Sequence, residues 1–314
     1  MPTNFKGGLL VDGIPVLPGA GLLNPAGHTW CVDANHGNDG NDGISLDASD
    51  SAGPLLTMQA AFNRLVSGDN ILVRGFVREQ LVTPVQIFDV TILGAANRPR
   101  HADSTPSGGE SGAAWGAPTS GAVSGQATCR VLQQGWRFAN ILFTAQGTTA
   151  AMIEIVRNAD SGNAERDGSH CSVLGCRFAG AGIGIRSGVA GSYTEIAYNC
   201  EIAHNKFNDN TTGMSGINGN SWQIHHNIFQ GCTSCITMAL QNSFIYENII
   251  GAFTAAGNSG GIDLNGGGGK CFVTKNYLSG TYSIAGGYRV SNANDEWAGN
   301  FNTLAGGITV ADPA

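Results

Sequence analysis

The sequence predicts an all-β protein, a parallel β-solenoid in which short strands coil around one core. Glycine contributes 47 of the 314 residues, about twice its ~7% average usage, which argues against a mainly helical chain. A short motif also recurs at intervals of 21 to 29 residues. Between its copies, brief apolar segments of period two alternate with turn residues, as expected for stacked coils of strands.

The repeated motif is an anchor residue with an apolar residue three positions before it and another two positions after it. Asparagine occupies the anchor in five of six copies, and the anchors are Cys176, Asn205, Asn227, Asn248, Asn276 and Asn300. Asn140 is a candidate earlier member. Asparagines stacked at a bend would hydrogen-bond along the stack and satisfy backbone groups of the turn. We therefore expect an asparagine ladder with a structural role.

A second short strand follows each anchor. These segments alternate in polarity, and they cover residues 153–155, 183–185, 236–238, 262–264 and 288–290. Their central residues define a column of Glu154, Gly184, Thr237, Asp263 and Arg289 when the coils are aligned. We expect this column on one exposed sheet.

The N-terminal third has a different organisation. Residues 1–29 are rich in Gly, Pro and Leu and are expected to form an extended arm, with the solenoid over residues 30–314. Met58, Phe62 and Leu65 fall at helical spacing, so a short capping helix is predicted there. Residues 71–73 and 90–93 are predicted strands. The segment 102–128 is dominated by Gly, Ser, Ala, Pro and Thr and is predicted to be an exposed insertion.

The composition excludes several classes of protein. Charged residues make up 12% and the net charge is −7, so the clustered basic residues that bind nucleic acid are not expected. The 42% hydrophobic content excludes a disordered chain. No apolar run reaches the ~18 residues of a membrane span, and no secretion signal is recognised. Synthesis in a cytoplasm is expected, with the eight cysteines reduced and buried as small residues.

The position before each anchor supplies the sharpest chemical feature. It is occupied by Gly175, His204, His226, Glu247, Lys275 and Gly299. Two histidines and a carboxylate in successive coils could bind a metal or exchange protons near neutral pH. The alternative is an outward polar column in which Glu247 and Lys275 form an exposed ion pair, and this alternative is favoured. His204, His226 and Glu247 stay as candidate catalytic residues.

Three further candidates carry weaker signals. Asp263 and Arg289 would adjoin on one sheet, although an ion pair between coils explains them better than catalysis, since no second carboxylate adjoins Asp263. The loop residues Asp39, Asn41 and Asp42 offer oxygen ligands for calcium but also suit plain turns. Cys232 and Cys235 form a CxxC pattern without further ligands and are interpreted as small core residues. No cofactor is expected.

Trp115 lies inside the small-residue insertion. An aromatic residue on an exposed loop is a plausible contact to a partner, so Trp115 is predicted to lie at an interface.

The run WCVDANHGNDGNDG, followed by PLLTMQAAFNRLVSGDNILVRG and VTILGA, resembles the opening of right-handed parallel β-helix proteins of the pectate-lyase-like superfamily. The segments GGLLVDGIPVLPGAGLL and AAWGAPTSG are also similar to β-helix proteins of tailed bacteriophages. That resemblance implies a homotrimeric virion component, such as a tail spike, a fibre or a capsid decoration.

The leading functional hypothesis is therefore a structural virion protein that contacts itself as a homotrimer and contacts capsid or tail proteins. It is expected to lack enzymatic activity and to be located in the virion. The alternative is a tail spike that binds or degrades bacterial surface polysaccharide, as a lyase or a glycoside hydrolase.

Overall fold

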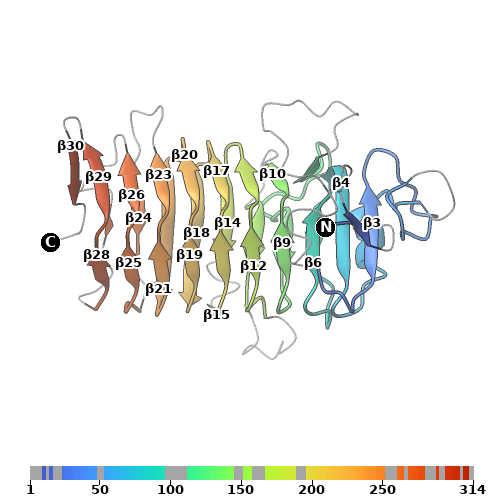
Figure 1. Cartoon of the computed structure of the whole chain (residues 1–314), viewed down its shortest axis with the longest axis horizontal. Coiled ribbons are helices and arrows are strands. Elements are labelled where there is room, and N and C mark those ends of the chain that lie inside the picture. The colour runs from blue at the N-terminus through green and yellow to red at the C-terminus, as the bar shows by residue number, and fades with distance from the viewer. Residues whose placement is uncertain are drawn as a thin grey trace, which may run out of the picture.

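The computed structural model describes residues 9–11, 14–16, 23–47, 53–95, 112–144, 151–157, 167–188, 196–251, 260–264, 268–279, 288–289, 294–304 and 307–310. Equivalent strands of successive coils lie side by side along one long axis, from the N-terminal coils to the C-terminal ones (Figure 1). The pairings between coils are parallel. The predicted all-β parallel β-helix is confirmed.

The described strands form three faces around the core. The first face contains β3 (Thr29–Asp33), the first half of β4 (Asn70–Arg78), β6 (Thr91–Gly94), β9 (Arg137–Ala139), β12 (Ser172–Leu174), β16 (Glu201–Ala203), β19 (Gln223–His225), β22 (Phe244–Tyr246), β25 (Phe272–Thr274) and β28 (Glu296–Ala298). The second face contains the rest of β4, then β7 (Ala113–Gly116), β10 (Leu142–Thr144), β13 (Arg177–Ala179), β17 (Lys206–Asn208), β20 (Ile228–Gln230), β23 (Ile249–Gly251), β26 (Tyr277–Ser279), β29 (Phe301–Leu304) and the antiparallel β30 (Gly307–Val310).

The third face is a separate sheet of nine strands. It contains β5 (Leu81–Val82), β8 (Cys129–Val131), β11 (Ile153–Ile155), β14 (Ile183–Ser187), β15 (Ala197–Tyr198), β18 (Thr212–Asn220), β21 (Ser234–Gln241), β24 (Gly260–Asp263) and β27 (Tyr288–Arg289). All five predicted second strands belong to this face. The sequence analysis missed β18, because its glycines hide the alternation of inward and outward residues.

The predicted alignment of the coils agrees with the strand register. On the first face, Val173 pairs with Ile202 and Ile202 with Ile224, and the second face pairs Phe178 with Phe207. The rings of Phe143, Phe178, Phe207 and Phe229 stack in the core, with successive centroids 5.3, 4.8 and 4.6 Å apart. One part of the alignment was wrong. Phe138 pairs with Val173, so Asn140 is equivalent to Gly175 and not to an anchor.

The asparagine ladder is also confirmed. The anchors Asn205, Asn227, Asn248, Asn276 and Asn300 are all buried. In each step of the ladder the side-chain oxygen of one asparagine accepts hydrogen bonds from both the backbone and the side-chain nitrogen of the anchor before it, at 2.9–3.1 Å. Each Nδ2 also donates to a backbone carbonyl of the preceding coil, such as that of Ile202 for Asn227. The ladder therefore fixes the bend between the first and second faces.

The N-terminal end is closed by α1 (Met58–Phe62), the predicted capping helix, which is five residues long. It packs Met58, Ala61 and Phe62 into the core, and its N-terminus is capped by Thr57. No helix among the described residues has the length to cross a bilayer. In the predicted arm, β1 (Leu9–Val11) and β2 (Ile14–Val16) pair with each other in an antiparallel hairpin.

The prediction that Trp115 lies at an exposed interface is wrong. Trp115 belongs to β7 on the second face and is 0% exposed. Its Nε1 donates to the Glu79 carbonyl, and its ring stacks on Phe143. The predicted insertion 102–128 therefore contains a core strand, while residues 102–111 lie outside the described part of the chain.

All eight cysteines are buried and form no disulfide bond, as interpreted from the sequence. Burial raises the pKa of the Cys31 thiol to about 12, and Cys232 and Cys235 are both fully buried. These thiols fill core space.

Candidate functional site

The bend before each ladder asparagine has a left-handed backbone. His204, His226, Glu247 and Lys275 have φ values of 58°, 53°, 55° and 55°, a conformation that costs about 1–2 kcal/mol for a residue with a Cβ. The ladder next to them holds the bend in place. Because every coil repeats the same bend, these side chains project outward in one row at the coil spacing. The predicted column of His204, His226 and Glu247 is confirmed as a spatial cluster.

The rings in this row contact each other directly. His204 and His226 stack with centroids 4.9 Å apart and an interplanar angle of 28°. His226 Nε2 lies 2.8 Å from Glu247 Oε2, and Lys275 Nζ lies 3.8 Å from Glu247 Oε1. The predicted ion pair between Glu247 and Lys275 is thus present, and at 40% and 70% side-chain exposure it contributes little stability.

His225 joins the cluster from the adjacent strand, and the sequence analysis missed it. It occupies an outward position at the end of β19, in register with Ala203 on one side and Tyr246 on the other. The small Ala203 leaves room for the imidazole, and the Tyr246 ring stacks on it at 4.7 Å. His225 is consequently 8% exposed although it faces outward.

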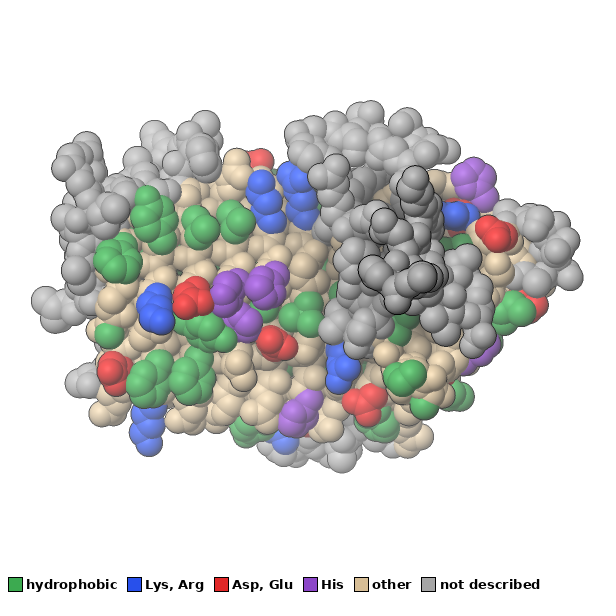
Figure 2. Space-filling view, in the orientation of Figure 1, with side chains coloured by type: hydrophobic (Ala, Val, Ile, Leu, Met, Phe, Trp, Pro, Cys, Tyr) green, Lys and Arg blue, Asp and Glu red, His purple; other side chains and the backbone are tan. Residues whose placement is uncertain are grey.

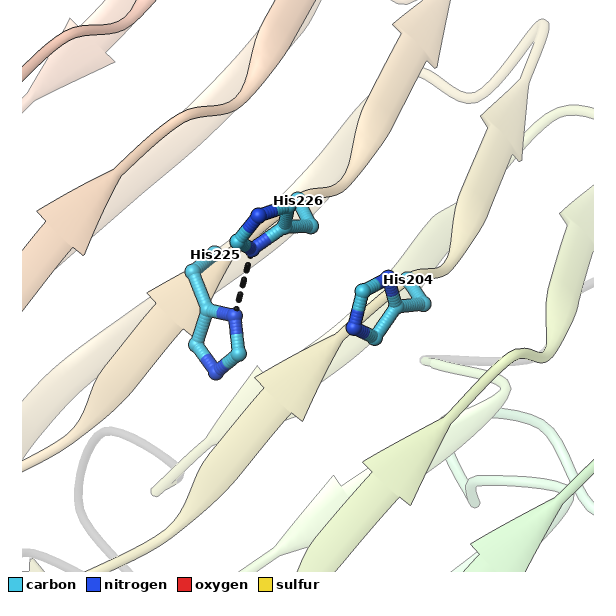
Figure 3. Close-up of side chains that lie close together, drawn as sticks. All are labelled: His204, His225 and His226. Atoms are coloured by element: carbon cyan, nitrogen blue, oxygen red, sulfur yellow. Dashed lines mark hydrogen bonds between the residues drawn. The ribbon is translucent and has the colours of Figure 1, made fainter. Parts of the chain in front are cut away.

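The two adjacent histidines link two carboxylates. His225 Nε2 lies 3.2 Å from Glu201 Oε1, and His225 Nδ1 lies 2.9 Å from His226 Nδ1 (Figure 3). With the contact between His226 and Glu247, this makes a chain of carboxylate, imidazole, imidazole and carboxylate. The chain crosses from β16 through β19 to the bend after β22. We call Glu201, His204, His225, His226 and Glu247 the histidine cluster.

Burial sets the electrostatics of the cluster. Desolvation lowers the pKa of His225 below its usual value, against the opposing effect of its bond to Glu201. Near neutral pH the His225 ring is therefore mainly uncharged, with one nitrogen that donates and one that accepts. Burial, with the Glu201 and Glu247 charges, raises the pKa of Tyr246, which keeps its hydroxyl protonated.

Two lines of exposed apolar side chains flank the cluster. On the first face Phe244 and Phe272 stack in register at 5.5 Å and are 47% and 42% exposed. On the second face Ile228, Ile249 and Phe301 share one outward column and are 41–47% exposed. Figure 2 shows the histidines and charged residues in a row between these two apolar groups. The row and its flanks run along the long axis.

Asp263 and Arg289 lie on the third face, away from the cluster strands. They are neighbours in register, as predicted, with Thr237 on the other side of Asp263. The column containing Glu154 differs from the prediction, because Ile153 pairs with Ile185 and Glu154 pairs with Arg186 instead of Gly184. The buried Glu154 carboxylate binds Arg186 and also Arg130 from the preceding coil.

The candidate calcium ligands accept hydrogen bonds from backbone groups, both in their own loop and in the segment that leads into α1. Asp39 accepts hydrogen bonds from the backbone nitrogens of Leu56 and Thr57 at 2.9 Å, and Asp42 accepts one from the Ile44 nitrogen. The Arg64 guanidinium binds the carbonyls of Asp39, Asn41 and Asp42. The Arg64 guanidinium therefore already occupies the loop carbonyls that a calcium ion could use as ligands.

No family model and no curated protein matches the sequence. Among solved structures, the chain is similar to the GH136 lacto-N-biosidase from Eubacterium ramulus, with 13% identity and a TM-score of 0.45, over 87% of this chain and 60% of that one. This chain thus covers less than two thirds of that protein. It is also similar to pectate lyase Pel9A, with 12% identity and a TM-score of 0.40, over 88% of this chain and 77% of that one. At these identities the likeness concerns the fold alone.

Proposed function

We propose that this protein binds an extended polysaccharide along the first and second faces, over the histidine cluster. The observation that carries the proposal is the row of polar side chains between two lines of exposed apolar ones, which extends over several coils. Exposed apolar patches mark interaction surfaces. Sugar rings present hydroxyl groups at their edges and C–H groups on their faces, so an extended glycan needs both kinds of contact in parallel lines.

The aromatic side chains of the first face provide the test of this proposal. Phe244→Ala and Phe272→Ala are each expected to weaken glycan binding roughly tenfold, about 1.4 kcal/mol, because each removes an apolar contact beside the polar row. Binding is measured by affinity electrophoresis against a panel of bacterial capsular and lipopolysaccharide glycans. Both side chains are almost half exposed, so neither truncation should unfold the chain.

Phe88→Ala is the matched control, because Phe88 is 37% exposed in the N-terminal coils, outside this surface. It is expected to leave glycan binding unchanged. Equal binding by all three variants, or no retention on any glycan of the panel, would contradict the proposal.

Glycan cleavage is a second candidate function, favoured by the carboxylate and imidazole chain. Glu201 and Glu247 lie two coils apart, roughly 10 Å along the axis, close to the upper end of the ~6.5–9.5 Å carboxylate separation of inverting glycosidases. If the protein cleaves a glycan, Glu247→Gln is expected to abolish release of reducing ends while binding persists. Asp263→Asn on the third face is the control and is expected to retain turnover. Release of reducing ends by both variants excludes this chemistry.

The homotrimeric virion component stays a prediction. Light scattering of the purified chain tests the trimer, and localisation in intact phage particles tests the virion assignment.

A further inference from the structure

Three histidine nitrogens converge on one point of the surface. One ring nitrogen each of His204, His225 and His226 lies within 4.8 Å of the others. Figure 3 shows the three rings grouped between two neighbouring coils, with His225 and His226 in contact. His204 and His226 are exposed, while His225 is buried between its neighbours. Solvent therefore reaches the group from the side of His204 and His226, while packing against its neighbours holds His225 in place.

The hydrogen bonds to the two carboxylates determine which nitrogens are free. An ionised carboxylate only accepts hydrogen bonds, so the Nε2 atoms of His225 and His226 are placed to donate to Glu201 and Glu247. The two Nδ1 atoms face each other at 2.9 Å. They are therefore the nitrogens that a metal ion can reach, and an ion between them would replace this direct contact.

We propose that His204, His225 and His226 bind one divalent transition metal ion of the zinc class. Zinc bonds to imidazole nitrogen at about 2.0–2.1 Å in tetrahedral sites, which places the nitrogens roughly 3.3 Å apart. The pair of His225 and His226 is already near this separation. His204 lies on an exposed bend and reaches the third position by rotation of its side chain. Solvent supplies the fourth ligand.

The two carboxylates that contact the histidines agree with this assignment. Histidines that bind metals usually donate their second ring hydrogen to a carboxylate, which fixes the ring and makes the ligand more basic. Glu201 and Glu247 stand in this relation to His225 and His226. Three imidazoles favour zinc, copper or nickel over calcium and magnesium, which prefer oxygen ligands. These three side chains can hold the ion whether or not a glycan is bound.

Equilibrium dialysis of the full chain against Zn²⁺, without glycan, tests the site. One zinc ion per chain is expected. His204→Asn and His226→Asn are each expected to weaken binding on the order of 100-fold or more, and Asn suits the left-handed backbone of both positions. Glu247→Gln should weaken binding by about 10–100-fold, because it removes a carboxylate behind a ligand. Circular dichroism checks that each variant is folded.

Co²⁺ supplies a spectroscopic test of the same geometry. The intense visible absorption of tetrahedral cobalt is expected for the native chain and for the control His36→Gln, whose histidine lies in the N-terminal loop beside Asp33. It should be lost in His226→Asn. The proposal is overturned if no stoichiometric zinc is bound. It is equally overturned if His204→Asn binds zinc as tightly as the native chain, because the site then lacks its third ligand.

Discussion

Replacing Asn227 with alanine is expected to lower the free energy of unfolding by about 3–5 kcal/mol. The substitution removes three buried hydrogen bonds. The Asn205 backbone nitrogen loses its acceptor, the Asn205 side-chain nitrogen keeps only the Val173 carbonyl, and the Ile202 carbonyl loses the Asn227 side-chain donor. Each unsatisfied buried group costs about 1–3 kcal/mol, and relaxation of the bend recovers part of the total. This is a large fraction of the stability of an ordinary domain.

Denaturant unfolding measures the loss, and hydrogen exchange locates it. The peptide that contains the Asn205 amide should exchange faster, because that amide donates to the Asn227 side chain. Gln223→Ala in the same coil is the control, since Gln223 points outward and is exposed, and it should change stability by less than about 0.5 kcal/mol. An Asn227→Ala protein as stable as this control would show that the ladder contributes no net stability.

The ladder also explains why the sequence predicts this fold well. A buried amide that must donate and accept along the stack allows few other residue types, so asparagine recurs at the same place in successive coils. Its recurrence fixes the alignment of the coils, and that alignment reproduces the register of Val173, Ile202 and Ile224. The residue before the anchor then falls in one outward row, which is how His204 and His226 were found.

Composition misled the prediction for Trp115. The surrounding segment is rich in small residues, as exposed loops often are, but here alanine and glycine form a tightly packed strand. A Cβ added at Gly116 would lie 2.5 Å from the Thr144 hydroxyl of the next coil, so any larger residue would force Thr144 to shift. In this segment the small residues allow neighbouring coils to pack closely. An exposed loop and a tightly packed strand can have the same small-residue composition, so composition alone did not separate them.

The sequence predicted only part of the candidate site, and it missed His225 and Glu201 for a different reason. His225 and Glu201 belong to outward strand positions, whereas the sequence analysis followed the column at the bend. The doublet of His225 and His226 was the available signal. When two adjacent residues lie at a strand end and the second has a left-handed backbone, both can project from the same side of the coil. A search of both columns together would have found the cluster.

Glu154 shows how loop length limits such alignment. A long connection separates β11 from the coil that follows, and the residue of β14 opposite Glu154 lies two positions further along the chain than a simple alignment places it. The partner of Glu154 is consequently Arg186. Glu154 is therefore a buried acidic side chain between two arginines instead of part of a surface column. Its side chain is 0% exposed, whereas the side chains of Arg130 and Arg186 are 21% and 18% exposed.

Glu154→Gln is therefore expected to destabilise the protein by about 3–5 kcal/mol, the usual cost of removing one partner from a buried ion pair. The glutamine keeps the shape of the side chain but has no charge. Arg130 and Arg186, on either side of it in adjacent coils, then repel each other while largely withdrawn from water. The loss is measured by denaturant unfolding, with the exposed Glu296→Gln on β28 as a control that should change stability by less than about 0.5 kcal/mol.

A triple variant separates charge from packing at this position. Replacing Arg130 and Arg186 with methionine and Glu154 with leucine removes all three charges and keeps the apolar volume. Because the desolvation cost of a buried charged triad can exceed its internal attraction, the triple variant is expected to be at least as stable as the native chain, although Glu154→Gln alone is not. If the triple variant is as unstable as Glu154→Gln, the carboxylate stabilises this face by its shape and hydrogen bonds, and the repulsion between arginines is not the cause of the loss.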